Sequence, residues 1–291
     1  MKHLRSSASI RGSIRGRLVK AGLILVTLLY GGAAAYLRLN ETSLVYRPGL
    51  RELAAPDARW ALNERVVTYR SADSTALSAW IIPAPNADSS TKWLLICHGQ
   101  TGNIGYGERP EFYASARATG LNLFAFDYRG FGASSGSPRE DGLYEDAVAS
   151  YRYLVDSLDV PPERIIIFGH SLGSGVAIEL AARVPAAALV VEGAYTSIPD
   201  RAQEIYPYFP VKLIATQRFA SIDKIARVRT PKLLLHSPTD DIIPFAHGQR
   251  LFARALEPKK FVTVRGGHIV AFREDSATYF GALRGLVQGL R

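Results

Sequence analysis

One short segment constrains the fold of this chain more than any other. The apolar run 165–168 leads directly into Gly169-His170-Ser171-Leu172-Gly173, and a segment rich in small residues follows as far as residue 183. The run favours a buried strand and the following pattern favours a helix. A turn this tight pushes the Ser171 side chain outward, and Gly169 and Gly173 leave room for the neighbouring strand and helix.

The rest of the chain alternates short β-rich runs with longer helical patterns. Continuous apolar runs such as IIIF and ALVV suit strands that are buried on both faces of a parallel sheet. The first two runs are separated only by the turn 71–74, which predicts an antiparallel pair. The alternation predicts an α/β fold with helices on both faces of the sheet. Predicted strands cover 65–70, 76–82, 93–97, 121–127, 164–168, 187–192, 232–236 and 260–264, and predicted helices cover 108–119, 140–158, 172–183 and 246–256.

Histidines that follow the serine supply the candidate base. A serine hydroxyl is a weak nucleophile unless a base takes its proton. On a strand–turn–helix of this kind the chain order is serine, then an acid, then histidine. His268 follows the last predicted strand in a loop that should pass over the sheet edge, so we predict that it is the base. We expect His236 and His247 to serve only in hydrogen bonds, and His170 to point away from Ser171.

The candidate acid follows the preceding strand. The loop 237–241 contains two carboxylates, and we predict that Asp240 holds His268 in the correct tautomer. Asp241 is then a solvated or loop-capping neighbour. Glu192, which ends an earlier strand, is the remaining alternative.

Backbone N–H groups are expected to stabilise the negative charge that acyl transfer places on a carbonyl oxygen. One donor is the N–H of Leu172, the residue after the serine, at the start of the predicted helix. The loop 98–103, which follows the strand 93–97, is placed to supply the second, and we predict the N–H of Gln100.

Charge is distributed unevenly along the chain. The net charge is +9, but no acidic residue precedes Glu41. Seven positive charges lie in that stretch, which leaves +2 for the remainder, so the sequence gives a nucleic-acid partner little support. The seven residues are Lys2, Arg5, Arg11, Arg15, Arg17, Lys20 and Arg38.

An uncharged stretch of 17 residues, 21–37, lies between Lys20 and Arg38. Its length is at the lower limit for a membrane-spanning helix, and the flanking basic side chains extend it. We expect a single-pass anchor over 21–38 in an inner or plasma membrane, with the basic segment 1–20 in the cytoplasm and the domain 42–291 outside, on the periplasmic side. A cleaved signal segment is the alternative, since 33–35 has the small residues of a cleavage site, and the protein would then be secreted.

Other features narrow the chemistry. Cys97 is the single cysteine and lies in an apolar run, which predicts a buried core residue. We find no clustered metal ligands, phosphate loop or dinucleotide fingerprint, so no cofactor or metal is expected. The segment 193–225 is short and contains several aromatic residues, and we expect it to form a small cap over the site.

Five motifs occur in an order that resembles a known group. They are His98-Gly99-x-x-Gly102-Asn103-Ile104-Gly105, Asp127-Tyr128-Arg129-Gly130-Phe131-Gly132, the segment 169–173, the loop HSPTDDIIP and Gly267-His268. Together with the entry 42–48 and a preceding membrane segment, they resemble the membrane-anchored α/β-hydrolases of the bud-emergence-like group. That group is similar to the α/β-hydrolase-domain depalmitoylases and to serine aminopeptidase-like hydrolases. Gln100-Thr101 departs from the Asn-Ala that is frequent in the group.

The resemblance implies an α/β-hydrolase fold with a mostly parallel, eight-stranded sheet. It implies a structural role for Asp127 and Arg129. We therefore expect a serine hydrolase that cleaves carboxylic esters or thioesters, including lipid-like acyl substrates, through an acyl-enzyme. A serine peptidase and an inactive membrane-tethered binding protein are the alternatives, and no obligate protein partner is inferred.

Overall fold

The computed structural model describes residues 4–49 and 60–290, with side chains from residue 16 onward. Residues 1–3, at the start of the predicted basic segment, lie outside the described residues, as does the last residue of the predicted domain.

An eight-stranded sheet forms the centre of the domain, in the order β1-β2-β4-β3-β5-β6-β7-β8. β2 runs antiparallel to β1 and β4, and the other neighbours pair in parallel. The predicted sheet and its antiparallel first pair are therefore confirmed, with strand ends that differ by up to two residues. The strands are β1 (Arg65–Arg70), β2 (Ala76–Ile82), β3 (Trp93–Cys97), β4 (Asn122–Phe126), β5 (Ile165–His170), β6 (Ala188–Glu192), β7 (Lys232–His236) and β8 (Lys259–Thr263).

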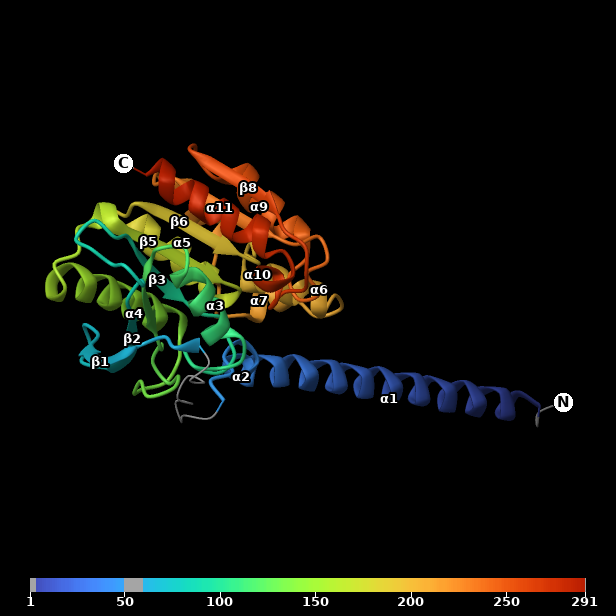
Figure 1. Cartoon of the computed structure of the whole chain (residues 1–291). Helices are drawn as coiled ribbons and strands as arrows, with labels where there is room; N and C mark the ends of the chain where they lie inside the picture. The colour runs from blue at the N-terminus through green and yellow to red at the C-terminus, as the bar shows by residue number, and fades with distance from the viewer. Residues whose placement is uncertain (1–3, 50–59, 291) are drawn as a thin grey trace.

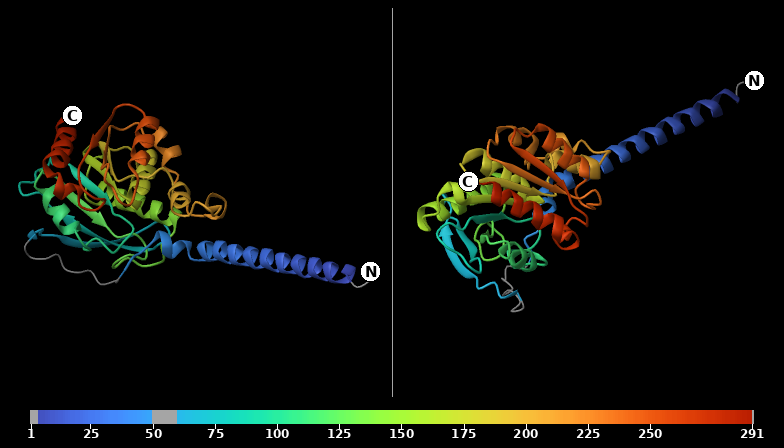
Figure 2. Two further views of the ribbon diagram at one scale, coloured as in Figure 1. Left: turned by 90° about the vertical axis from the view of Figure 1, so that its right-hand side faces the viewer. Right: turned by 45° about the horizontal axis from the view of Figure 1, so that its top comes forward.

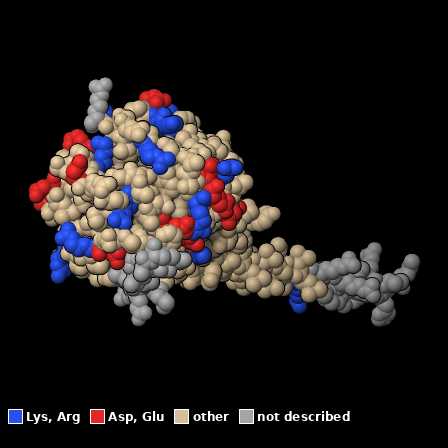
Figure 3. All heavy atoms as spheres, viewed as in Figure 1, with Lys and Arg blue, Asp and Glu red and all other residues tan. Residues whose placement is uncertain are grey.

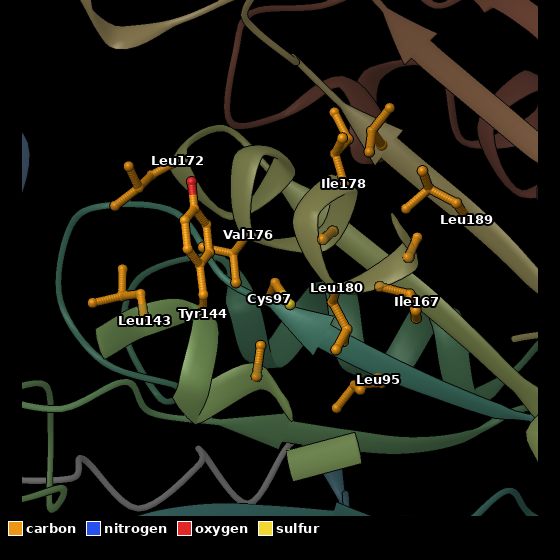
Figure 4. Close-up of a cluster of buried hydrophobic side chains, with 14 of the residues drawn as sticks. Leu95, Cys97, Leu143, Tyr144, Ile167, Leu172, Val176, Ile178, Leu180 and Leu189 are labelled. Atoms are coloured by element: carbon orange, nitrogen blue, oxygen red, sulfur yellow. The ribbon is translucent and has the colours of Figure 1, made fainter. Parts of the chain in front are cut away.

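Alternate side chains of each central strand enter two separate hydrophobic layers. In β3, Leu95 and Cys97 belong to one layer, whereas Leu94 and Ile96 belong to the other. Cys97 is fully buried, as predicted. Figure 4 shows the first layer, in which Leu143 and Val176 from two helices approach β3. Burial on both faces explains why these strands are continuously apolar in sequence.

Helices cover both faces of the sheet, as the sequence predicted. The first layer receives side chains from α4 (Glu140–Arg152), α5 (Leu172–Arg183) and α9 (Phe245–Arg254). The second receives them from α3 (Arg109–Arg117), α10 (Ala271–Glu274) and α11 (Ser276–Gly289). The predicted helix 140–158 continues beyond α4 as a π-helical turn, Tyr153–Ser157, and the sequence patterns did not predict α11.

The segment predicted as a cap, 193–225, lies between β6 and β7 and keeps that name below. It contains three short helices, α6 (Ile198–Ile205), α7 (Val211–Ile214) and α8 (Ser221–Lys224). Figures 1 and 2 show α6 and α7 beside the point where the long N-terminal helix meets the body.

That helix, α1 (Leu4–Leu39), projects away from the body and is followed by the short α2 (Glu41–Val45). Its segment Gly16–Leu39 is 24 residues long and apolar enough to cross a membrane, and none of its most apolar stretch is buried. A signal sequence satisfies the same test. On the face seen in Figure 3, basic and acidic side chains are interspersed over the body, whereas the described part of the projecting helix is almost entirely uncharged.

Candidate active site

Ser171 occupies the turn between β5 and α5 in a backbone conformation that is rare for a residue with a side chain. Its φ is 53° and its ψ is −123°. A Cβ on Gly169 would lie 2.4 Å from the carbonyl oxygen of Gly173, and one on Gly173 would lie 2.0 Å from that of Cys97. Both glycines are therefore required for the helix to pass this close to the strands, as the sequence predicted. The surrounding structure holds the backbone of Ser171 in this strained conformation. Strain of this kind is typical of functional residues.

His268 and Asp240 form a hydrogen-bonded pair at the ends of neighbouring strands. The Nδ1 atom of His268 lies 2.7 Å from Oδ2 of Asp240. The other oxygen, Oδ1, accepts the backbone N–H groups of Ile242 and Ile243 at 2.9 and 2.7 Å. Burial acts to raise the pKa of Asp240, but these hydrogen bonds and the interaction with His268 outweigh it and lower the pKa. An ionised Asp240 therefore favours the His268 tautomer that carries its proton on Nδ1.

Asp241 contacts the same histidine in a different way. Its Oδ1 accepts the backbone N–H of His268 at 3.1 Å. Gly193 lies against the pair with a φ of +54°, and a Cβ there would lie 2.8 Å from Cε1 of His268. Asp240 thus contacts the ring of His268 and Asp241 contacts its backbone. The absence of a side chain at Gly193 leaves room for the ring.

The Nε2 atom of His268 is buried and has no hydrogen-bond partner among the described residues. Ser171 lines the same cavity as His268, although no hydrogen bond joins its Oγ to this Nε2 within the described part of the chain. Such contacts are frequently long before a substrate binds. The structure therefore brings the three predicted side chains together, since His268 lines one cavity with Ser171 and is hydrogen-bonded to Asp240.

The two predicted N–H donors lie near the serine. Within the described residues, neither the N–H of Gln100 nor that of Leu172 donates to a protein acceptor. A Cβ on Gly99 would lie 3.5 Å from Cβ of Ser171, so the loop passes directly over the serine. The loop is held by Arg47, whose N–H donates to the Gln100 carbonyl at 2.9 Å and whose carbonyl accepts the N–H of Gly102 at 2.8 Å.

His170 has a contact that the sequence did not reveal. Its Nε2 lies 3.0 Å from the backbone carbonyl of His268, and the two ring centroids are 4.9 Å apart. Burial, helped by the charge of His268, lowers the pKa of His170 to about 3. The His170 ring is therefore neutral at physiological pH and carries one proton. Because a carbonyl oxygen can only accept, the contact with His268 places that proton on Nε2. His170 was expected to point away from Ser171, but it lines the same cavity as the serine. Its position next to Ser171 in the sequence was the signal that it lies at the site.

The other candidate residues lie close to the site but make different contacts. His236 lies 3.0 Å from the carbonyl of Ile243 through Nε2, and His247 contacts Thr196 and Glu204, so both take part in hydrogen bonds as expected. Glu192 is buried and accepts a hydrogen bond from Tyr279 at 2.7 Å. No hydrogen bond joins Glu192 to a histidine in the parts of the chain that are described.

Two cavities meet at Ser171, and both are also lined by Gln100 and Ile242. The first, here called the aromatic cavity, encloses about 840 Å³ including its open part, and its wall contains Phe112, Tyr113, Phe168 and Phe272. The second, here called the aliphatic cavity, encloses about 1090 Å³ and extends under the cap, with a wall that contains Leu37, Leu44, Ile198, Val211 and Ile214.

Aromatic residues of the cap are used in several ways. Tyr195 is buried and its hydroxyl donates to the Leu172 carbonyl at 3.2 Å. Tyr206 lines the aliphatic cavity, whereas Tyr208 is exposed. In the described ranges no group of three or more His, Cys, Asp or Glu side chains is arranged to hold a metal ion.

Comparisons with known proteins agree with this fold. Residues 92–218 match a family described as the alpha/beta hydrolase fold. The uncharacterized protein Rv2307c of Mycobacterium tuberculosis is 35% identical over 84% of this chain and 86% of its own length. Alpha/beta hydrolase domain-containing protein 17B of Homo sapiens is 34% identical over 64% of this chain and 62% of its own. The lysophosphatidylserine lipase ABHD12 of Danio rerio is 33% identical over 63% of this chain and 51% of its own.

Among solved structures, the esterase Pf2001 of Pyrococcus furiosus superposes with a TM-score of 0.70. The superposition covers 84% of this chain and 98% of the esterase, at 18% sequence identity. At that identity the similarity concerns the fold alone.

Proposed function

Because this chain belongs to the α/β-hydrolase family, we propose that it is a serine hydrolase that cleaves carboxylic esters or thioesters through an acyl-enzyme at Ser171. The observation that carries the proposal is the His268–Asp240 pair, because His268 lines the same cavity as Ser171 and its Nε2 has no hydrogen-bond partner among the described residues. A relative named as a lipase supports an acyl substrate.

The first chemical step adds Ser171 to the substrate and forms a tetrahedral intermediate, from which the acyl-enzyme arises. Ser171 Oγ attacks the carbonyl carbon of the substrate while its proton moves to Nε2 of His268. Asp240 stabilises the resulting imidazolium through Nδ1–H. The carbonyl oxygen, now negative, accepts the N–H groups of Leu172 and Gln100.

The second step releases the products. His268 returns the proton from Nε2 to the leaving alkoxide or thiolate as the tetrahedral intermediate collapses. A water molecule then gives a proton to Nε2 and its oxygen attacks the acyl carbon. Collapse of that second intermediate releases the carboxylic acid and restores the proton to Ser171 Oγ.

The test compares covalent labelling by a fluorophosphonate in the wild-type protein and in Ser171→Ala. Labelling that is lost only in the variant supports an activated serine at this position. Folded wild-type protein that is not labelled would contradict the proposal and favour an inactive binding scaffold. Hydrolysis of amino-acid amides but not of esters would instead favour a peptidase.

A matched pair of variants tests which carboxylate acts on the histidine ring. We expect Asp240→Asn to lower kcat by about 10⁴-fold, the size of loss known for the wrong histidine tautomer. Asp241→Asn keeps an oxygen that can accept the His268 N–H, so its activity should fall far less. A greater loss at Asp241 than at Asp240 would contradict the assignment.

The same proposal includes a location for the protein. The basic residues that precede residue 21 keep the N-terminus in the cytoplasm, α1 anchors the chain, and the domain from residue 42 faces the outside. An alkaline phosphatase fused after residue 291 should then be active. An inactive fusion would refute this orientation, and loss of α1 from the mature protein would indicate a secreted form.

A further inference from the structure

The aliphatic cavity connects the serine to the N-terminal helix. It is lined by Ser171 and Leu172 at one end and by Leu37 and Arg38, the last turn of α1, at the other. Its side walls are α2 and the cap helices α6 and α7. Because the wall is mostly aliphatic, the cavity suits an unbranched hydrocarbon chain better than a polar group.

The two walls are joined by a buried carboxylate. Glu41 of α2 is 8% exposed, and its Oε1 accepts the backbone N–H groups of Thr216 and Gln217, each at 2.8 Å. Its Oε2 accepts the hydroxyl of Thr216 at 2.6 Å. These charge-assisted bonds join α2 to the cap and so fix two walls of the aliphatic cavity relative to each other.

The cap also contacts α1 itself, well inside the apolar segment. The ring of Tyr30 stacks on Phe209 with centroids 4.9 Å apart and planes 14° from parallel. The Tyr30 hydroxyl donates to the carbonyl of Tyr208 at 2.8 Å. Tyr30 lies seven residues before Leu37, on the order of 10 Å along the helix. If α1 spans a membrane over 21–38, the cap at this contact therefore lies below the headgroups, among the acyl chains.

Large apolar side chains are exposed on the same part of the cap. Tyr208 and Leu213 are each 86% exposed and Ile205 is 52% exposed. They lie next to a helix whose most apolar stretch is unburied, so the apolar surface of the cap continues that of α1. We call Ile205, Tyr208 and Leu213 the cap tip.

We propose that the cap tip inserts into the bilayer beside α1, and that the aliphatic cavity takes the long acyl chain of a membrane lipid ester directly from the bilayer to Ser171. This inference rests on the proposed function. The acyl chain enters the aliphatic cavity beside α1, because the last turn of α1 lines that cavity. The aromatic cavity, which Ser171 also lines, then holds the alcohol part of the lipid.

Insertion is tested with a single thiol, because the native Cys97 is fully buried. Leu213→Cys in the full chain is labelled with a polarity-sensitive fluorophore and reconstituted into phosphatidylcholine vesicles that contain a spin-labelled lipid. We expect a blue-shifted emission that the spin label quenches. The control is Val66→Cys on β1, an exposed apolar residue far from α1, which should show neither effect. Equal, water-like emission at both sites would overturn the proposal.

The acyl site is tested by chain length. Each methylene moved from water into an apolar groove favours binding by about fourfold, so kcat/KM for soluble esters should rise with acyl length until the groove is full. Ala202→Trp fills the groove, and we expect it to remove this rise while two- to four-carbon esters are still cleaved. Ala149→Trp, in a surface depression on α4, is the matched control. A rise that persists in Ala202→Trp would overturn the groove assignment.

A final comparison separates the possible failures. Hydrolysis of a long-chain lysophospholipid in vesicles should exceed that of a palmitoylated cysteine peptide in the same vesicles, and the reverse order would overturn the choice of a lipid. Short esters cleaved through Ser171 with no effect of chain length would refute this inference alone. Quenching at residue 213 in a protein that cleaves no ester would instead refute the proposed function and keep the membrane contact.

Discussion

Glu192 places an ionisable group inside the wall of the aromatic cavity. Burial raises its pKa from 4.5 to about 8, the hydrogen bond from Tyr279 acts against this rise, and the charge of Asp240 adds to it. The folded protein therefore holds a proton on Glu192 at neutral pH, whereas the unfolded chain does not.

The free energy of unfolding must depend on pH as a result. Below pH 4.5 both states bind the proton, and this group adds no pH dependence. As pH rises from 4.5 to about 8 only the folded state remains protonated, so stability is lost progressively. Each tenfold difference in proton affinity is worth about 1.4 kcal/mol, which gives a loss on the order of 5 kcal/mol by pH 9.

The perturbation is Glu192→Gln, which keeps an oxygen that can accept from Tyr279 but cannot ionise. In the variant, residue 192 should add almost no pH dependence to the free energy of unfolding between pH 5 and pH 9. The variant should therefore be more stable than wild type at pH 9. The assay is chemical denaturation of the full chain in detergent at both pH values, with the exposed Glu163→Gln as control. If Glu192→Gln and wild type share the same pH dependence, Glu192 is not a buried neutral acid.

Two further changes test the packing around the site. Gly193→Ala introduces a Cβ 2.8 Å from Cε1 of His268 and 3.3 Å from Oδ2 of Asp240, so kcat for a short ester should fall by about 10²-fold or more. An unchanged kcat would contradict this. Arg129→Ala removes the partner of the fully buried Asp146, which lies 2.8 Å from the guanidinium, and should lower the free energy of unfolding by about 3–5 kcal/mol in a denaturant titration. A loss below about 1 kcal/mol would show that water solvates Asp146 in place of the guanidinium.

The sheet was predictable because its strands follow a simple physical rule. Central strands of this sheet are buried on both faces, so their apolar runs are continuous and easily recognised. The turn at Ser171 was equally clear, because glycine is the only residue that fits at 169 and 173. Strand ends were less certain because the last residues, such as Gly169 and His170 of β5, pair in the sheet without being apolar.

Helix α11 was missed for a related reason. It contains Gly281, Gly285 and Gly289, and glycine is a weak helix former. A Cβ at each of these positions would meet nothing within 4 Å, so the glycines are not needed for packing. The opposite face, with Tyr279 and Leu283, is buried against the sheet and stabilises the helix by tertiary contact, which no local pattern reveals.

The aliphatic cavity could not be predicted, because its walls come from distant parts of the chain. Tyr30 and the carbonyl of Tyr208 are 178 residues apart in sequence. Each wall taken alone is an ordinary apolar helix or loop. Only the fold shows that the end of α1 and the serine line one cavity.

Asp240 and Asp241 show where sequence reasoning about the site reached its limit. The two residues have the same chemistry and adjacent positions, so residue type cannot assign their roles. Backbone geometry does so, because the N–H groups of Ile242 and Ile243 fix Asp240 with one oxygen directed at the His268 ring, while Asp241 reaches the His268 backbone. An adjacent pair of acids in such a loop is therefore better understood as a two-point clamp on one histidine than as an acid and a spare. On this view Asp241→Ala, which removes the acceptor, should impair activity more than Asp241→Asn.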